Sequence, residues 1–174
     1  MALFPNRILI GKGAIEGGPE GGPALVFGSG MAAIASIFGA VLRPGEIAVL
    51  PADSYYTTRL IATGDFTQMG VQVRLAPTAG NAQIEHIKGA KLVWLETPTN
   101  PGLEVCEIAT LVEAAHAEGA LVAVDNTTPT ALGQQPLALD ADYSVASDTK
   151  ALTGHSDLLL GHVAARDSAL LDPV

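Results

Sequence analysis

The 174-residue sequence predicts an α/β fold, a three-layer arrangement around a mostly parallel β-sheet. Short apolar segments suited to buried strands alternate along the chain with segments of helical periodicity. The apolar segments show little polar–apolar alternation, so both faces of each strand should be covered. Helices are therefore expected on both sides of the sheet.

The elements begin after an N-terminal arm or loop, expected over residues 1–23 because glycine and proline recur there without periodicity. The folded core is expected over residues 24–174. Residues 24–27 form an apolar segment typical of a strand, and residues 30–42 have the pattern of a helix. A Pro-Gly pair follows and should end that helix.

The middle of the chain continues the alternation. Residues 47–51 and 71–76 predict strands on either side of a helix over residues 54–69. The pattern over residues 78–89 is weak and predicts no element. Residues 91–96, with the sequence KLVWLE, clearly predict a further strand.

The last part of the chain opens with a helix over residues 107–119. Its apolar residues stand at positions 108, 111, 112 and 115, the spacing of one helical face, and a glycine follows as a natural C-cap. Three further strands are expected at residues 121–125, 143–147 and 161–166. The final eight residues have the composition of the start of another helix.

Composition limits the kinds of partner. Hydrophobic residues make up 48% of the chain and charged residues 16%, which is typical of a globular core. The formal net charge is -9 and no Lys/Arg cluster is present, so nucleic acid and anionic membrane are excluded as expected partners. A single cysteine and the lack of a signal-peptide pattern or an 18-residue apolar segment favour a cytoplasmic protein.

Candidate functional residues cluster after the predicted strands. In open α/β sheets, ligands bind at the carboxyl ends of the strands. Five such ends carry glycines, hydroxyls, an amide, a carboxylate or an amine. They are residues 28–31, 53–56, 97–101, 125–127 and 147–150.

The glycine turn at Gly28 lies between a strand and a helix, and a helix N-terminus there can bind an anion. Gly28, Gly30 and Ala33 also fit the G-x-G-x-x-A pattern of Rossmann-like dinucleotide-binding domains, and Asp53 could contact a ribose. A tight turn without any ligand is the third possibility. The pattern alone does not decide between the three.

Asp125 and Lys150 favour a different cofactor, pyridoxal 5'-phosphate (PLP). A dinucleotide site uses neither residue, whereas PLP needs a lysine for the Schiff base and a carboxylate opposite its pyridine nitrogen. Tyr55 could stack on the ring. Backbone and hydroxyl groups for the phosphate are available at Gly30, Met31, Ser147 and Thr149.

The segment around Lys150 resembles the PLP-lysine signature of the Cys/Met-metabolism PLP enzymes. It reads Ser-Asp-Thr-Lys over residues 147–150, followed by Gly-His-Ser-Asp over 154–157. Further blocks of that family occur in order, namely SGMAAI from residue 29, WLETPTNPGLEV from residue 94 and AVDNT from residue 123. The resemblance covers residues 24–167. The family includes cystathionine γ-synthase, cystathionine β- and γ-lyases and methionine γ-lyase.

The resemblance implies the large domain of a fold type I PLP enzyme, with Lys150 as Schiff-base lysine and proton carrier. It implies that Asp125 pairs with the pyridine nitrogen and that Tyr55 stacks on the ring and takes part in acid–base steps. Asn100 resembles the residue that hydrogen-bonds the phenolic oxygen of the cofactor. The resemblance implies that Gly30, Met31, Ser147 and Thr149 bind the phosphate. It implies that Glu96 and Thr127 are supporting residues behind the direct cofactor contacts.

The implied function is a lyase or transferase of sulfur amino-acid metabolism. It would carry out β/γ-elimination or replacement on cystathionine or a related small amino acid. The resemblance also implies a homo-oligomer, a dimer or tetramer.

Several features depart from the family pattern. Asp148 stands where the family has a small residue, Ala151 replaces an aromatic, and residues 56–58 replace a glycine-rich segment. On a strand, Asp148 would point away from the site. The family's Tyr-x-Arg arm motif is missing, and the sequence ends before a C-terminal small domain, so we expect a truncated chain. An inactive fragment of the PLP fold therefore remains an alternative.

The remaining candidates are assigned structural roles. No histidine pair has metal-ligand spacing beside a second cluster, so no metal site is expected. Cys106 is expected to be a small buried residue and Trp94 a core residue. The histidines are also assigned structural roles. His86 and His116 are expected on a helix or loop surface, His155 in the signature segment and His162 at the start of a strand.

Overall fold

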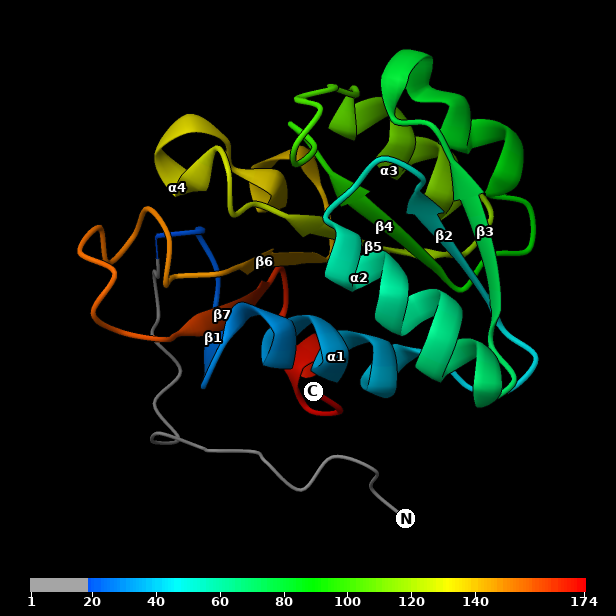
Figure 1. Cartoon of the computed structure of the whole chain (residues 1–174). Helices are drawn as coiled ribbons and strands as arrows, with labels where there is room; N and C mark the ends of the chain where they lie inside the picture. Colours follow the sequence, from blue (N-terminus) through cyan, green and yellow to red (C-terminus); the bar gives the residue numbers. More distant parts are fainter. Residues whose placement is uncertain (1–18) are drawn as a thin grey trace.

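The computed structural model describes residues 19–174, which form one seven-stranded sheet covered by helices (Figure 1). The sheet has the order β1-β7-β6-β5-β4-β2-β3. The strands are β1 (Ala24–Phe27), β2 (Ile47–Pro51), β3 (Gln72–Ala76), β4 (Leu92–Glu96), β5 (Leu121–Asp125), β6 (Tyr143–Ala146) and β7 (Gly161–Ala165).

The sheet is mostly parallel, as the sequence predicts. Strands β3, β2, β4, β5 and β6 pair in parallel with one another in that order. Strand β7 is antiparallel to both of its neighbours, β6 and β1. The first strand of the chain therefore runs in the same direction as the central strands, and its carboxyl end lies at the same edge.

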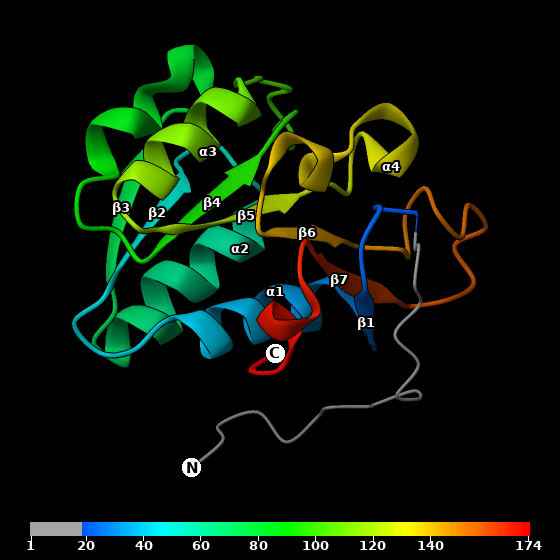
Figure 2. The ribbon, with the colours of Figure 1, turned by 180° about the vertical axis from the view of Figure 1, so that it is seen from behind.

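Helices cover both faces of the sheet (Figures 1 and 2). One face carries α1 (Gly30–Val41) and α2 (Tyr56–Ile61), and α2 continues as the π-helical segment η1 (Ala62–Phe66). The opposite face carries α3 (Ile108–Ala117) and the 3-10 helices η2 (Ala79–His86) and η3 (Pro136–Leu139). The short helices α4 (Thr130–Gly133) and η4 (Ser168–Leu171) complete the described elements.

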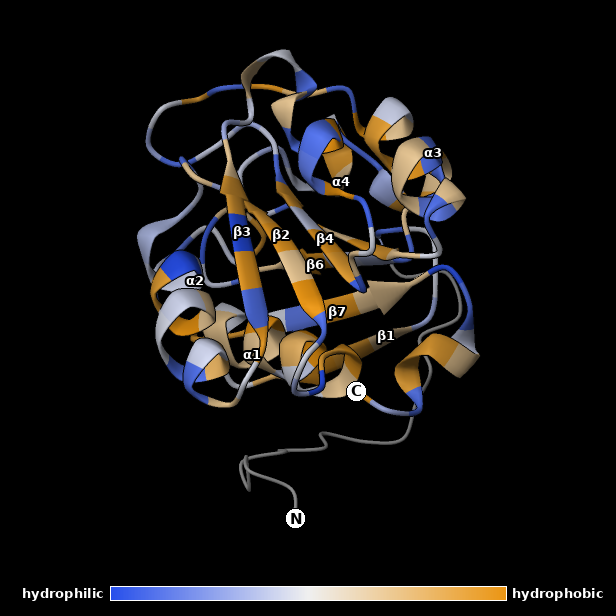
Figure 3. Ribbon diagram, turned by 90° about the vertical axis from the view of Figure 1, so that its right-hand side faces the viewer, coloured by the Kyte–Doolittle hydropathy of each residue, from blue (hydrophilic) through white to orange (hydrophobic). Residues whose placement is uncertain are grey.

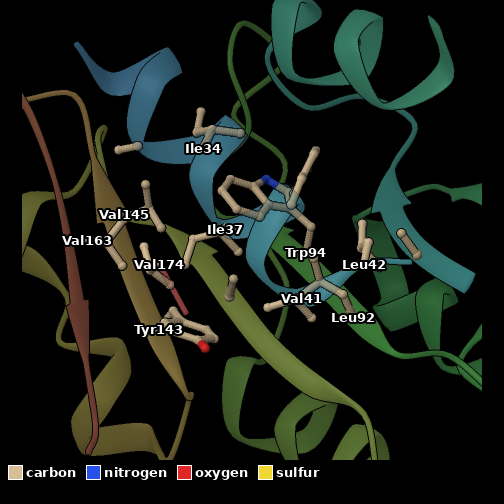
Figure 4. Packing of buried hydrophobic residues seen from close by; sticks show 14 of the residues in the cluster. Ile34, Ile37, Val41, Leu42, Leu92, Trp94, Tyr143, Val145, Val163 and Val174 are labelled. Atoms are coloured by element: carbon tan, nitrogen blue, oxygen red, sulfur yellow. The ribbon is translucent and has the colours of Figure 1, made fainter. Parts of the chain in front are cut away.

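Alternating residues of the central strands supply two separate cores. In β4, Trp94 packs under α1, whereas Val93 and Leu95 pack under α3. The Trp94 ring makes an edge-to-face contact with Phe38, with ring centroids 5.1 Å apart. Figure 3 shows the apolar central strands between mixed helices, and Figure 4 shows Trp94 in its cluster. Burial on both sheet faces explains why these strands are apolar throughout.

The differences from the predicted elements lie in the irregular helices. The helix predicted over residues 54–69 is α2 followed by a π-helical turn, in which the Thr67 N–H donates to the carbonyl of Ala62. The weak region 78–89 contains η2, which is kinked by positive φ angles at Gly80 and Asn81. The prediction contained no helix between β5 and β6, where α4 and η3 lie.

Three further points concern the described residues as a whole. The arm expected over residues 1–23 lies outside the described residues except for 19–23, a turn that leads into β1. Within residues 19–174, no helix is both long and apolar enough to cross a bilayer. The same residues contain no group of three metal-binding side chains.

Candidate active site

A pocket of about 190 Å³ opens at the carboxyl ends of the parallel strands. Its walls come from the start of α1, the end of β4, the end of β5 and the turn after β6. Glu96, nominated as a supporting residue, lines this pocket, and so do all nine residues nominated to hold the cofactor. They are Gly30, Met31, Tyr55, Asn100, Asp125, Thr127, Ser147, Thr149 and Lys150.

One end of the pocket is suited to an anion because α1 begins there. The first N–H groups of a helix have no carbonyl within the helix to bind, and the helix dipole is positive at that end. The Ser29 side chain caps the helix by accepting a hydrogen bond from the Ala32 N–H at 3.1 Å. The absence of a side chain at Gly30 lets the start of α1 lie close to Ser147, because a Cβ at Gly30 would be 2.6 Å from the Cβ of Ser147.

The hydroxyl groups at this end are not equivalent. The Thr149 hydroxyl donates to the Leu160 carbonyl at 3.1 Å and accepts from the Leu160 N–H at 2.9 Å. Its proton is therefore already used inside the protein. The Ser147 hydroxyl has no hydrogen-bond partner among the described residues, so it has both donor and acceptor capacity left.

Asp125 supplies a buried carboxylate at the end of β5. Its Oδ1 accepts hydrogen bonds from the Thr127 hydroxyl at 2.6 Å and the Thr127 N–H at 3.1 Å. Its Oδ2 accepts none from the described residues. Burial raises the pKa of Asp125, and the Thr127 hydrogen bonds lower it less. A cationic N–H group facing Oδ2 would stabilise the ionised form.

Glu96 links two other walls of the pocket. Its Oε2 accepts a hydrogen bond from the Tyr55 N–H at 2.8 Å, and its Oε1 accepts one from the Asn100 N–H at 2.7 Å. Burial raises the pKa of Glu96 to about 7, and the negative charge of Asp125 adds to this effect. The segments that carry Tyr55 and Asn100 are thus fixed by one carboxylate.

Lys150 lies in an exposed turn directly after β6. Its N–H donates to the Ser147 carbonyl at 3.0 Å, and its carbonyl accepts from the Gly154 N–H at 3.1 Å. The turn is continuous with the wall that carries Ser147 and Thr149. The amine of Lys150 and the carboxylate of Asp125 thus belong to the same pocket.

These groups match the chemistry of PLP. The anion-binding end suits a phosphate, the free Oδ2 of buried Asp125 suits a pyridinium N–H, and Lys150 supplies an amine. The pocket supports the dinucleotide-binding alternative less well than PLP. Asp53, its expected ribose partner, is not part of the pocket and binds the Thr78 N–H and hydroxyl at 3.2 and 2.8 Å.

Other nominated residues lie elsewhere. Asp148 is not part of the pocket lining, although it lies in the turn after β6 and not on a strand as assumed in the prediction. It pairs with buried His162, with Oδ1 and Nδ1 2.7 Å apart. His116 pairs with Asp142 at the opposite end of the strands, with Nε2 and Oδ2 2.9 Å apart. His155 is exposed. Neither His–Asp pair was predicted, because partners separated by 14 and 26 residues leave no local pattern in the sequence.

The remaining missed residues of the pocket are Ser29, Ile34, Thr128, Val145, Ala146 and Leu159. Ser29 lies inside a block that the sequence analysis had quoted, and an N-cap serine before an apolar helix is a usable signal. The apolar residues follow helix and strand patterns that predict core positions and carry no signal for a pocket.

The fold and pocket define an α/β protein of the PLP-dependent class. A family model described as "Cys/Met metabolism PLP-dependent enzyme" matches residues 13–173. The chain therefore belongs to the Cys/Met-metabolism family of PLP-dependent enzymes, as the sequence blocks around Lys150 indicated.

Curated relatives agree with this assignment. A protein of Streptomyces coelicolor named "Putative cystathionine gamma-lyase" is 55% identical over 170 residues, which are 97% of this chain and 43% of the relative. The cystathionine gamma-synthase of Mycobacterium tuberculosis is 41% identical over 155 residues, 87% of this chain and 39% of that protein. The chain thus spans about two fifths of the length of these relatives.

Solved structures show the same fold. A cystathionine gamma synthase from Xanthomonas oryzae pv. oryzae, solved in complex with cystathionine, matches with a TM-score of 0.84 and 34% identity. The match covers 89% of this chain and 41% of that structure. A protein from Micromonospora echinospora, titled a cystathione gamma lyase in one structure and a methionine gamma lyase in another, matches with a TM-score of 0.84 in both.

Proposed function

We propose that this chain forms the cofactor-holding part of a PLP-dependent lyase or transferase of the cystathionine γ-lyase and γ-synthase type. One observation supports this proposal most directly. The pocket combines a buried carboxylate with a free Oδ2, a lysine on the adjoining turn and an anion-binding helix end. These are the three contacts that PLP requires.

Each residue has a distinct role in this proposal. The α1 N-terminus and the Ser147 hydroxyl hold the phosphate, and the Lys150 amine holds the cofactor and then moves the α-proton of the substrate. Asp125 keeps the pyridine nitrogen protonated, Tyr55 covers the ring face and Asn100 contacts the phenolic oxygen. When bound, PLP supplies the electron sink for an amino-acid carbanion.

The substrate and the assembly are also proposed from the relatives. A small amino acid such as cystathionine is the proposed substrate, because proteins named for it are 34 to 55% identical to this chain. We further propose a cytoplasmic homo-oligomer in which residues 24–174 act as the PLP-binding core.

The proposal is tested by the absorbance spectrum of the purified protein with added PLP. We expect a visible band that borohydride removes, and we expect Lys150→Ala to lack it because Lys150 is the only lysine among the described residues that line the pocket. Lys88→Ala is the matched control, since Lys88 is an exposed lysine outside the pocket and should leave the band unchanged. An identical band in Lys150→Ala would refute the assignment of this lysine.

A further inference from the structure

A buried cluster of charged residues lies directly behind the pocket. His162 in β7 stands between two carboxylates, with Nδ1 2.7 Å from Asp148 Oδ1 and Nε2 3.6 Å from Glu20 Oε1. All three side chains are at most 9% exposed. They come from the turn before β1, the turn after β6 and the strand between those two strands. Figure 1 shows the first two segments side by side.

The Glu20 carboxylate is hydrogen-bonded to two residues of the sheet and its strand ends. Its Oε2 accepts hydrogen bonds from the Ser144 hydroxyl at 2.9 Å and the Asn126 amide at 3.0 Å. Both donors belong to the central strands or their ends. Glu20 is therefore fixed to the ends of the central strands. Its contact with His162 is the 3.6 Å ion pair alone, because the buried Nε2 of His162 has no hydrogen-bond partner among the described residues.

The Asp148 side of the cluster connects to the pocket. Asp148 is two residues before Lys150, and its carbonyl accepts the Thr153 N–H at 3.0 Å, so it organises the turn that carries the lysine. A small cavity beside the cluster shares Thr127 and Ser147 with the main pocket. The cluster therefore lies next to the pocket.

The segment between β6 and β7 is otherwise held by hydrogen bonds, from the Thr149 hydroxyl to the Leu160 backbone and from the Ser147 N–H to the Thr127 hydroxyl. Most of residues 150–160 are exposed and have no regular structure. Among the ion pairs of residues 19–174, only the Asp148–His162 pair involves this segment. Burial lowers the pKa of His162, but the contacts with Asp148 and Glu20 outweigh burial and raise it to about 9. The imidazole is therefore charged at neutral pH.

We propose that His162 is a positioning residue for Lys150, because it fixes the lysine-bearing turn through Asp148 while Glu20 anchors it to the sheet. The inference rests on the proposed function in one respect, since the position of Lys150 matters to PLP. The structural part stands without PLP and can be tested in the apoprotein.

The first test is hydrogen exchange in the apoprotein. His162→Leu leaves Asp148 buried without a donor, so the amides of Lys150, Thr153 and Gly154 should exchange about tenfold faster, while amides of β4 keep their rates. His162→Gln keeps an N–H donor and should restore part of the protection. His116→Leu, which breaks the matched pair with Asp142, should not affect these three amides.

The second test uses the holoprotein. His162→Leu should bind PLP about tenfold more weakly and shift the pH midpoint of its visible band, with His162→Gln between it and the unsubstituted protein. The double variant Asp148→Ser/His162→Leu removes the unpaired acid if the single variant does not fold, and it should still show the faster exchange. Exchange at residues 150–154 equal to that in His116→Leu, in whichever His162 variants fold, would overturn the inference. A missing band in the unsubstituted protein would count against the proposed function alone, because the exchange result does not depend on it.

Discussion

Two carboxylates face the same pocket from neighbouring strands. Glu96 ends β4, Asp125 ends β5, and the two residues are partners in the parallel register. Two negative charges in a buried site raise each other's cost of ionisation. Each carboxylate has its own hydrogen-bond donors. Glu96 accepts from two backbone N–H groups, and Asp125 accepts from the N–H and hydroxyl of Thr127.

This pairing leads to a prediction about titration. Asp125→Asn should lower the pKa of Glu96 below its value of about 7, because burial remains but the neighbouring negative charge is gone. The change is measured by NMR titration of the glutamate side chains in the apoprotein. Asp53→Asn is the graded control, since Asp53 is the weakest contributor to the shift. An unchanged Glu96 titration in Asp125→Asn would show that burial alone sets it.

At the residue scale, strand-end reasoning from the sequence nominated Asp125 and Lys150 and left the supporting contacts open. Strand ends of a parallel sheet meet at one edge, so these positions follow from element order. The bond from Glu96 to the Tyr55 N–H joins residues 41 apart and depends on side-chain rotamers. Such a contact leaves no periodic pattern in the sequence from which it could be predicted.

Among the elements, the close approach of α1 to the strand edge depends on glycine at two positions. A Cβ at Gly161 would lie 2.5 Å from the Gly30 nitrogen, and a Cβ at Gly30 would lie 2.6 Å from the Ser147 Cβ. Contacts this short involve backbone or a short side chain, so they cannot be relieved by a flexible side chain. The anion-binding end of the pocket therefore exists only if β7 and α1 stay this close.

Gly161→Ala should lower the free energy of unfolding by about 1–3 kcal/mol, because overpacking displaces backbone. Urea denaturation measures this change. The matched control is Gly28→Ala, since a Cβ at Gly28 would have nothing within 4 Å. Equal effects of the two substitutions would mean that the contact between α1 and β7 is not tight in solution.

The elements were largely predictable where burial is regular. Every predicted strand is present within a residue or so, because strands covered on both faces are apolar throughout. The helix predicted over residues 54–69 is helical from residue 56 to residue 68, and the change to π-type hydrogen bonding in η1 has no signature in the apolar pattern. Helices α4 and η3 are too short to show periodicity.

For the whole molecule, the buried cluster predicts a pH dependence of stability. The folded-state pKa of His162 is raised from 6.5 to about 9, so its stabilising contribution is complete below pH 6.5 and is lost as the pH rises through about 9. The free energy of unfolding, from urea denaturation, should therefore fall between pH 7 and pH 9. Glu96, whose pKa is also raised, adds a separate fall between pH 4.5 and 7.

The double variant Asp148→Ser/His162→Leu should show a flatter profile between pH 7 and pH 9, because the titrating group is gone. His116→Leu should keep the profile of the unsubstituted protein in that range. A slope that persists unchanged in the double variant would assign it to other groups.

The position of β1 has a consequence for synthesis on the ribosome. Among the strands of residues 19–174, β1 is made first, and its only partner there is β7, whose residues 161–165 are made more than 130 residues later. While the ribosome adds the central strands, the nascent β1 has an unpaired edge and α1 has no finished sheet edge to rest on. The anion-binding end of the pocket can therefore form only after β7 has been made, and until then the unpaired edge of β1 is open to wrong pairing.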